Sequence, residues 1–447
     1  MCCGVKRLLS IGLIVLAAAT PLAAALLRFE WVEARAAERA ARVDEEREKL
    51  HAPSKLLDLD RARRNGDLLS QRRHVWSVLT QLAGTQASES EARFASWYGE
   101  DQVFDDASTM QVPRGIHGFS RGSVASTTPS SKGVEASHSA DAPILTYTLY
   151  NAAAYEHIRA YGLYFRATLD LLQVAGPADE AVAANRAVPA FPAQSVVLKT
   201  GWWPVAQASV FTAVPVWDPR DNPPRRGGNG YLTWPRVVAI DPTNRSPPES
   251  TASVEFAGRT FPHAHRVNLQ DFYSVIVDAE LAANAMRDPD TQKAVSIALG
   301  RPLRVGDYLV LVAGNLATKE IGDWVWAAFW WHDRPDEGAF AASRPIELQG
   351  AWRNYLMQAA FDDAMPRTNQ GEPHVCFNPW LEARFPDGGH GGGTSSNCLS
   401  CHRRASYPPI GFLPVTRGDP DLTGDPAYAS GRLRTSFLWA LALHAKP

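Results

Sequence analysis

The clearest pattern along the chain is a series of β-branched and aromatic runs in its middle part, each bounded by Gly, Pro, Asn or Asp. Runs of this kind predict β-strands. The predicted strands cover residues 195–203, 231–240, 251–261, 308–313 and 323–331. Residues 324–331 are apolar at every position, which predicts a central strand with both faces covered. We therefore expect a β-rich domain in the middle of the chain.

Three stretches carry apolar side chains at spacings of three and four residues, which predicts amphipathic helices. They cover residues 158–172, 269–286 and 352–359. Asn268 stands where it would cap the second of these helices. Together the patterns predict an α+β fold, in which a β-rich central domain has flanking helices and is followed by a short C-terminal segment.

The N-terminus has the pattern of an export signal. Lys6 and Arg7 precede an apolar run over residues 8–27, and three alanines at 23–25 offer a cleavage site. The run is also long enough to cross a bilayer as an uncleaved membrane anchor. The following residues, 28–66, are rich in Ala, Glu and Arg and predict a solvated helical stalk. With either kind of N-terminus, the rest of the chain is expected outside the cytoplasm.

These patterns divide the chain into four expected parts. They are a signal peptide or membrane anchor (1–27), a charged stalk (28–66), a β-rich body with flanking helices (67–348) and a C-terminal segment (349–447). A formal net charge of -2 over 447 residues gives nucleic-acid binding no electrostatic support. A hydrophobic content of 45% is typical of a folded chain.

The C-terminal segment contains a CxxCH motif made of Cys398, Cys401 and His402. Two thiols at this spacing can each form a thioether to one vinyl group of a haem, and the histidine beside the second thiol can bind the iron as its proximal ligand. The motif therefore predicts one covalently bound haem c. Haem is attached to such motifs outside the bacterial inner membrane, in agreement with the export signal.

The same thiols also fit half of a zinc site. Zinc usually takes four Cys or His ligands, and Cys376 with His374 or His390 could complete such a set. A structural zinc site at Cys376, Cys398 and Cys401 is therefore the lesser alternative to haem.

The sixth iron ligand is not evident from the motif, because no methionine follows it in the chain. The candidates are Met357, Met365, His374, His390 and His444. We favour Met357 as the distal ligand, with an open, water-bound iron as the alternative. Met357 also lies beside a predicted helical stripe, where it would serve equally well as core filling.

The β-rich body carries further residues that suit a site. Trp202 and Trp203 beside Lys199 could stack on a flat ring, although tryptophans at this density are more often part of a core. His263 and His265 would point to one face of an extended strand and could chelate a metal, but no third ligand is identifiable. We assign none of these residues to the site.

Three strings of residues resemble a group of exported bacterial proteins of the cytochrome c family. They are CFNPWLEARF at 376–385, SNCLSCHRRA at 396–405 and SFLW at 436–439. These proteins also share a tryptophan-rich WVWA strand, here residues 324–327, ahead of a single C-terminal haem motif. The resemblance implies covalent haem and a periplasmic location. It implies no particular reaction, so only Cys398, Cys401 and His402 are carried over.

We therefore predict a periplasmic monohaem c-type cytochrome that passes single electrons to or from a periplasmic or membrane redox partner. The chain has no nucleophile elbow, phosphate loop or catalytic-triad signature. Two alternatives stay open: a haem-c-dependent oxidoreductase acting on a small organic substrate or peroxide, and a haem sensor module. The oxidoreductase is kept because the β-rich body is larger than electron transfer alone requires.

Overall fold

The computed structural model describes ten stretches of the chain, all within one compact unit that begins at Ser54. They are residues 68–84, 92–107, 110–120, 143–174, 186–208, 211–222, 230–360, 375–383, 396–409 and 432–447. The predicted signal or anchor (1–27) and stalk (28–66) lie outside the described residues, as do His374, His390 and Met365.

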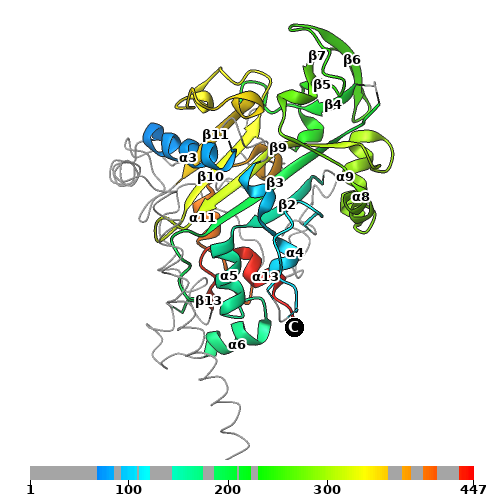
Figure 1. Cartoon of the computed structure of the whole chain (residues 1–447). Helices are drawn as coiled ribbons and strands as arrows, with labels where there is room; N and C mark the ends of the chain where they lie inside the picture. Colours follow the sequence, from blue (N-terminus) through cyan, green and yellow to red (C-terminus); the bar gives the residue numbers. More distant parts are fainter. Residues whose placement is uncertain are drawn as a thin grey trace, which may run out of the picture. The chain divides into compact units, whose positions relative to one another are not determined.

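A seven-stranded antiparallel sheet forms the centre of this unit (Figure 1). Its order is β1-β2-β3-β9-β10-β11, with β8 paired to part of β9. The strands are β1 (Tyr98–Gly99), β2 (Leu145–Tyr150), β3 (Val196–Val205), β8 (Ser274–Ile276), β9 (Tyr308–Thr318), β10 (Val325–Trp331) and β11 (Tyr355–Ala360). Every residue of β10 is buried, which confirms the predicted central strand covered on both faces.

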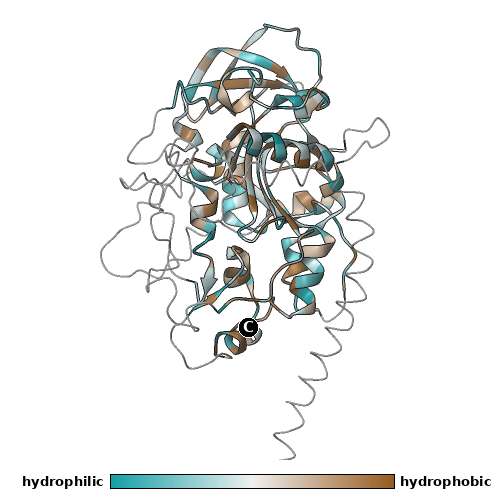
Figure 2. Cartoon of the chain, turned by 90° about the vertical axis from the view of Figure 1, so that its left-hand side faces the viewer, coloured by the Kyte–Doolittle hydropathy of each residue, from teal (hydrophilic) through white to brown (hydrophobic). Residues whose placement is uncertain are grey.

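Two smaller sheets complete the β-structure. A four-stranded sheet has the order β4-β5-β7-β6, in which β5 and β7 are parallel. Its strands are β4 (Thr212–Pro215), β5 (Val237–Asp241), β6 (Thr251–Phe256) and β7 (Arg259–Asn268). β12 (Ser406–Tyr407) pairs with β13 (Leu433–Arg434). The four-stranded sheet, at the top of Figure 2, has mixed hydrophilic and hydrophobic colouring, because β6 and β7 are largely exposed.

The described helices are mostly short. The α-helices are α3 (Leu68–Leu82), α4 (Glu100–Val103), α5 (Ala152–Ala160), α6 (Arg166–Val174), α8 (Ala279–Ala285), α9 (Pro289–Leu299), α10 (Pro379–Glu382), α11 (Cys398–His402) and α13 (Trp439–His444). The 3-10 turns are Arg93–Ser96, Tyr231–Thr233, Leu269–Asp271, Ala339–Ala341 and Gly350–Asn354. The structure thus combines helices with a large antiparallel sheet, as expected for a β-rich α+β fold. None of the helices that the structure describes is long and apolar enough to cross a membrane.

The two faces of the seven-stranded sheet pack against different helices. Successive side chains of a strand point to opposite faces. Ala327 and Phe329 lie on one face, here called the core face, which belongs to the same hydrophobic cluster as residues of α3 and α9. Trp326 and Ala328 lie on the other, here called the motif face, which shares a second cluster with residues of α5, α11 and α13. The two faces therefore provide separate environments.

Two of the predicted helices differ from the structure. The stretch 158–172 is divided between α5 and α6, because Gly162 has a positive φ of 63° and breaks the helix. The stretch 269–286 begins with a 3-10 turn, continues as β8 and becomes helical only in α8. Asn268 still caps a turn, since its backbone N–H donates to the Asp271 carboxylate at 2.7 Å.

The third predicted helix, 352–359, is also wrong. Residues Gly350–Asn354 form a 3-10 turn, and the rest becomes the strand β11 at the edge of the sheet. All six residues of β11 are buried. A short strand that is buried on both faces shows no alternation of apolar and polar residues, so the spacing of its apolar residues resembled that of an amphipathic helix. Pairing with β10 decides the outcome.

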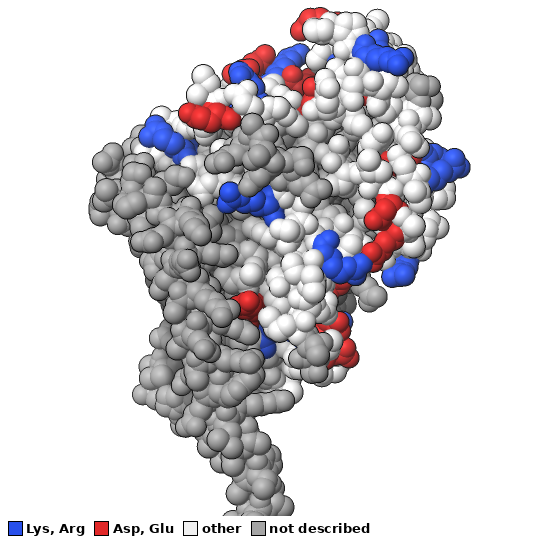
Figure 3. Space-filling view, in the orientation of Figure 1, with Lys and Arg blue, Asp and Glu red and all other residues white. Residues whose placement is uncertain are grey.

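Figure 3 shows how charged residues are distributed over one face of the described surface. In the view of Figure 3, basic and acidic side chains alternate and form no large patch of one sign. This agrees with the small net charge of the chain.

Candidate functional site

The CxxCH motif forms α11, which packs on the motif face beside β10 (Figure 1). The Asn397 side chain accepts the Leu399 N–H at 2.9 Å and so satisfies a free amide at the start of the helix. At the other end, the Arg403 guanidinium binds the Asp323 carboxylate just before β10, with Nε 3.2 Å from the oxygen. The motif is thus held at both ends.

The segment 375–383 lies beside α11 on the motif face and is bound to the strands by side-chain amides. The Phe377 N–H donates to the Gln358 Oε1 at 2.8 Å. The Asn378 amide donates to Asn315 Oδ1 at 2.9 Å, and the Asn315 amide in turn donates to Glu382 Oε1 at 2.8 Å. We call residues 375–383 the docking segment, because the haem motif rests on it.

The structure brings the three cysteines of the C-terminal segment together. The Cys398 N–H donates to the Cys376 carbonyl at 2.9 Å, and the Cys398 Sγ lies 3.2 Å from the same oxygen. Contact with the Cys376 side chain and burial both raise the pKa of the Cys398 thiol, and burial raises the pKa of Cys401 to about 11. Both motif thiols are therefore protonated at neutral pH.

The zinc alternative receives no support from the described residues. None of them forms a group of three or more His, Cys, Asp or Glu side chains suited to hold a metal ion. The expected fourth ligands, His374 and His390, lie outside the described residues.

His402 has the hydrogen bond that a metal-binding histidine needs. Its Nδ1 lies 2.7 Å from the Phe437 carbonyl oxygen, which can only accept, so we assign the ring proton to Nδ1. This leaves the lone pair on Nε2 for a metal. Burial lowers the pKa of His402 to about 4, with a further contribution from the positive charge of Lys199, so the ring is neutral.

Trp326 packs beside the same imidazole. The two ring centroids are 4.0 Å apart and the planes meet at 32°, so the indole covers a face of the imidazole and not its nitrogen edge. The indole N–H donates to the Asp323 carbonyl at 3.0 Å, which fixes the indole in position. His402 is therefore held by a hydrogen bond on its edge and by an aromatic ring on its face.

Met357 lies on the opposite face of the sheet from His402. It pairs directly with Phe329 and belongs to the core face, whereas Trp326, three residues earlier on β10, belongs to the motif face. A seven-stranded sheet therefore separates Met357 from His402, and we do not retain Met357 as a distal ligand. His444 lies on the side of the motif face, where its Nε2 is 3.4 Å from a Glu100 oxygen.

A row of polar residues crosses the motif face and was not found from the sequence. Cross-strand pairing aligns Thr148, Lys199, Asn315, Ala328 and Gln358 on five neighbouring strands. All five project to the same face as Trp326, because directly paired residues share a face. Each polar member interrupts an apolar strand, but the alignment of these residues into one row can be recognised only once the strand register is known.

The remaining sequence candidates have structural roles. Trp202 and Trp203 are at most 1% exposed, and Trp203 packs against Trp380 with ring centroids 5.5 Å apart. They belong to the core and form no surface platform. His263 and His265 do lie on one extended strand, β7, and His265 Nδ1 is 3.9 Å from an Asp333 oxygen.

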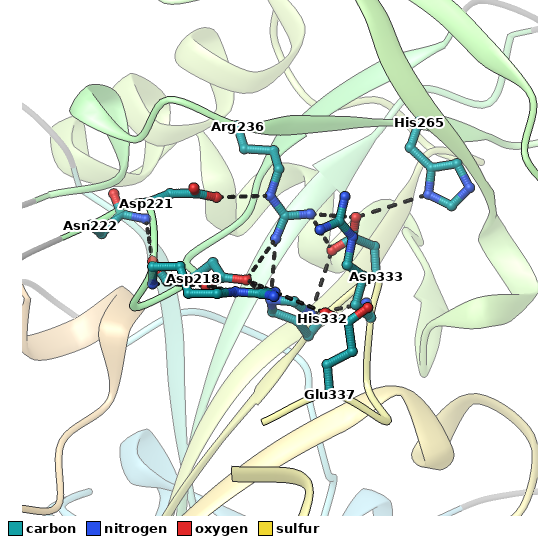
Figure 4. Close-up of polar contacts among 10 residues, drawn as sticks. Asp218, Asp221, Asn222, Arg236, His265, His332, Asp333 and Glu337 are labelled. Atoms are coloured by element: carbon teal, nitrogen blue, oxygen red, sulfur yellow. Dashed lines mark hydrogen bonds and ion pairs between the residues drawn. The ribbon is translucent and has the colours of Figure 1, made fainter. Parts of the chain in front are cut away.

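A second polar cluster lies where the two large sheets meet and is centred on Arg236 (Figure 4). The Arg236 guanidinium is 2.6 Å from Asp333 Oδ1 through Nη1 and 3.6 Å from Asp218 Oδ2 through Nη2. Both carboxylates have side chains that are 3% exposed. His332, equally buried, lies 3.5 Å from each of them. We call these four residues the Arg236 cluster.

The Arg236 cluster joins strands of both sheets. Arg236 precedes β5, Asp218 follows β4, and His332 and Asp333 follow β10. The Arg334 N–H donates to His332 Nδ1 at 2.9 Å, and Arg236 Nη2 lies 3.2 Å from His332 Nε2. Burial lowers the pKa of His332, and side-chain and backbone hydrogen bonds from Arg220 hold the pKa of Asp218 at about 2 against the effect of burial. Asp218 and Asp333 both face Arg236, and Asp218 also faces Arg220, so we assign the cluster a structural role.

Comparison with models of known protein families gives no match to this chain. Searches among curated proteins and among solved structures give no match either. The resemblance to exported cytochrome c proteins therefore stays a prediction. The chemistry of α11 and of the residues around it is the basis for assigning a function.

Proposed function

We propose that this protein is a monohaem c-type cytochrome that works outside the cytoplasm and passes single electrons to or from a redox partner. The observation that carries the proposal is the hydrogen bond between His402 Nδ1 and the Phe437 carbonyl at 2.7 Å. A histidine that binds iron through Nε2 is usually oriented by such a bond on its other nitrogen. Here this histidine follows two cysteines on one short helix.

Each residue of the site has a separate task in this proposal. Cys398 and Cys401 would hold the haem edge through thioethers, and His402 would bind the iron. The Phe437 carbonyl and Trp326 would keep the imidazole in one orientation. Haem bound there would supply an iron that changes between its ferric and ferrous states by one electron. The apolar surroundings of α11, formed by α5, α13 and the motif face, would exclude water and so influence the reduction potential.

The polar row on the motif face favours a second candidate function. The positive charge of Lys199 acts on His402, and Thr148, Asn315 and Gln358 lie in the same row. These residues suit a polar ligand, such as peroxide or a small organic substrate, near an iron with an open sixth position. The candidate is a haem-c-dependent oxidoreductase, or a sensor if the ligand binds without turnover.

Haem attachment is tested by exporting the full chain in a bacterial host that has the haem-attachment machinery. We expect a haem stain that survives denaturation, and its loss in Cys398→Ala and Cys401→Ala. Cys376→Ala is the matched control, since it removes a buried neighbouring thiol outside the motif and should keep the stain. One equivalent of zinc with no haem, released by Cys376→Ala, would overturn the proposal.

The two functions are separated by the spectrum of the ferric protein. A low-spin spectrum that azide does not change supports electron transfer. A high-spin spectrum that azide or peroxide changes supports the second candidate. For electron transfer, the reduced protein must also be reoxidised by a periplasmic or membrane acceptor, and a failure with every acceptor tried would remove that function.

A further inference from the structure

Among the residues that the structure describes, Cys376 is the one thiol outside the CxxCH motif, and it lies against the motif. Cys376 is fully buried in the docking segment and Cys398 is 8% exposed. They belong to the same hydrophobic cluster on the motif face. Cys376 therefore has a defined neighbour, and that neighbour is one of the two thiols proposed to bind haem.

The backbone around the two cysteines is arranged like a short parallel bridge. Cys376 pairs with Asn397, the residue before Cys398. The Cys376 N–H donates to the Ser396 carbonyl at 3.0 Å, and the Cys398 N–H donates to the Cys376 carbonyl at 2.9 Å. Such bonding places the Cα atoms of Cys376 and Cys398 roughly 5–6 Å apart, within the spacing that a disulfide requires.

The Cys398 side chain also lies against Cys376. The Cys398 Sγ lies 3.2 Å from the Cys376 carbonyl oxygen and interacts with the Cys376 side chain. Cys398 therefore has two thiol neighbours, Cys376 across the bridge and Cys401 one helical turn later on α11. Of these three, Cys401 is half-exposed and the other two are buried.

We propose that Cys376 and Cys398 form a reversible disulfide in the haem-free protein, which withholds Cys398 from haem attachment until it is reduced. The disulfide itself depends only on the thiols. Its effect on attachment rests on the proposed function.

The oxidant would be the disulfide of an extracytoplasmic thiol oxidoreductase, which reacts first at Cys401, the least buried of the three thiols. A Cys401 sulfur bonded to the partner is then attacked by Cys398, which forms the Cys398–Cys401 disulfide and releases the partner as a dithiol. Attack of Cys376 on the Cys398 sulfur moves the bond to Cys376–Cys398 and returns Cys401 to a thiol. Two thiols have lost two electrons and two protons, and the partner disulfide has gained both. A dithiol reductant reverses the sequence before haem is attached.

The disulfide is tested on the full chain exported in a host that lacks the haem-attachment machinery. Free thiols are alkylated at low pH, and peptides are mapped by mass spectrometry without reduction. We expect a Cys376–Cys398 linkage with alkylated Cys401, little or no linkage in Cys401→Ser, which lacks the thiol that reacts first, and a Cys398–Cys401 linkage in Cys376→Ser. A wild-type chain with a Cys398–Cys401 linkage, or with three alkylated thiols, would overturn the inference.

The effect on haem attachment needs a separate measurement. In a host with the attachment machinery but a weakened dithiol reductant, haem staining of Cys376→Ser is expected to exceed that of the wild type about threefold or more. Cys376→Ala is the second variant, because alanine fills the buried position without a polar atom. Equal staining in all three proteins would show that the disulfide does not restrain attachment. A linkage without any haem stain would instead defeat the proposed function and leave the disulfide standing.

Discussion

Replacing Arg236 by methionine tests whether the Arg236 cluster holds the two large sheets together. The guanidinium contacts two carboxylates, Asp333 at 2.6 Å and Asp218 at 3.6 Å, whose side chains are both 3% exposed. The Arg236 side chain itself is 20% exposed. Methionine keeps the length and the apolar stem of the side chain but leaves two buried negative charges beside the neutral His332.

The expected loss follows from the cost of an uncompensated buried charge. Removing one partner of a buried ion pair lowers the free energy of unfolding by about 3–5 kcal/mol. The Arg236 side chain is partly exposed and water can reach the site, so we expect about 3 kcal/mol at pH 7. A carboxylate that has lost its cation takes up a proton more readily. The difference between variant and wild type is therefore expected to narrow toward pH 5.

Arg220 offers a matched control. It also binds Asp218, at 2.7 Å, but its side chain is 58% exposed. Arg220→Met should lower the unfolding midpoint less than Arg236→Met, because water reaches the exposed Arg220 side chain and can replace its hydrogen bonds to Asp218. The assay is urea denaturation of the full exported chain, followed by tryptophan fluorescence. Equal midpoint shifts for Arg236→Met and Arg220→Met would refute the argument that burial decides the outcome.

Three further predictions concern other parts of the molecule. Burial lowers the pKa of His157 to about 4, against a hydrogen bond to the Pro189 carbonyl, so the unfolded chain binds more protons below about pH 6.5 and stability falls toward pH 4. Between pH 7.5 and pH 5, the free energy of unfolding measured with urea should fall less for His157→Gln than for the wild type, by on the order of 1–3 kcal/mol. An equal fall in both proteins would contradict this. Met357→Leu should leave the haem spectrum unchanged and cost less than about 1.5 kcal/mol, whereas loss of a low-spin band would show that Met357 reaches the iron. Asn378→Ala should lower the free energy of unfolding measured with urea by about 1–3 kcal/mol, because it removes the hydrogen bond to the Gly314 carbonyl and the cap of α10. An unchanged midpoint would show that Asn378 does not hold the docking segment.

The sheet was predictable where a strand carries its own signal. The apolar run of β10 and the β-branched runs of β3 and β9 identify themselves through composition. β11 does not, because its burial on both faces depends on the partner strand and on the docking segment. The helical stretch 158–172 failed at Gly162, where one residue with positive φ redirects the chain. Tertiary contacts decided the first case, and the local conformation of a glycine decided the second.

The candidate site was predictable to the extent that its chemistry is local. Spacing alone places Cys398, Cys401 and His402 on one turn of helix. The Phe437 carbonyl, 35 residues further on, left no trace in the sequence, since every residue has a carbonyl. The prediction of Met357 as the distal iron ligand failed for a related reason. Met357 is near the motif along the chain, but the face on which it lies is set by its register with Phe329.

The docking segment also affects the order in which folding and the proposed haem attachment can occur. Once residues 375–383 have packed beside α11, Cys398 is only 8% exposed. An enzyme that joins haem to both thiols must therefore act on a chain whose last part has not yet packed, or must pull that part away. Attachment and folding compete in time, so a chain released quickly from export and a chain released slowly should carry different amounts of haem. A haem-free chain that is first refolded and then offered to the attachment machinery should be the poorest substrate.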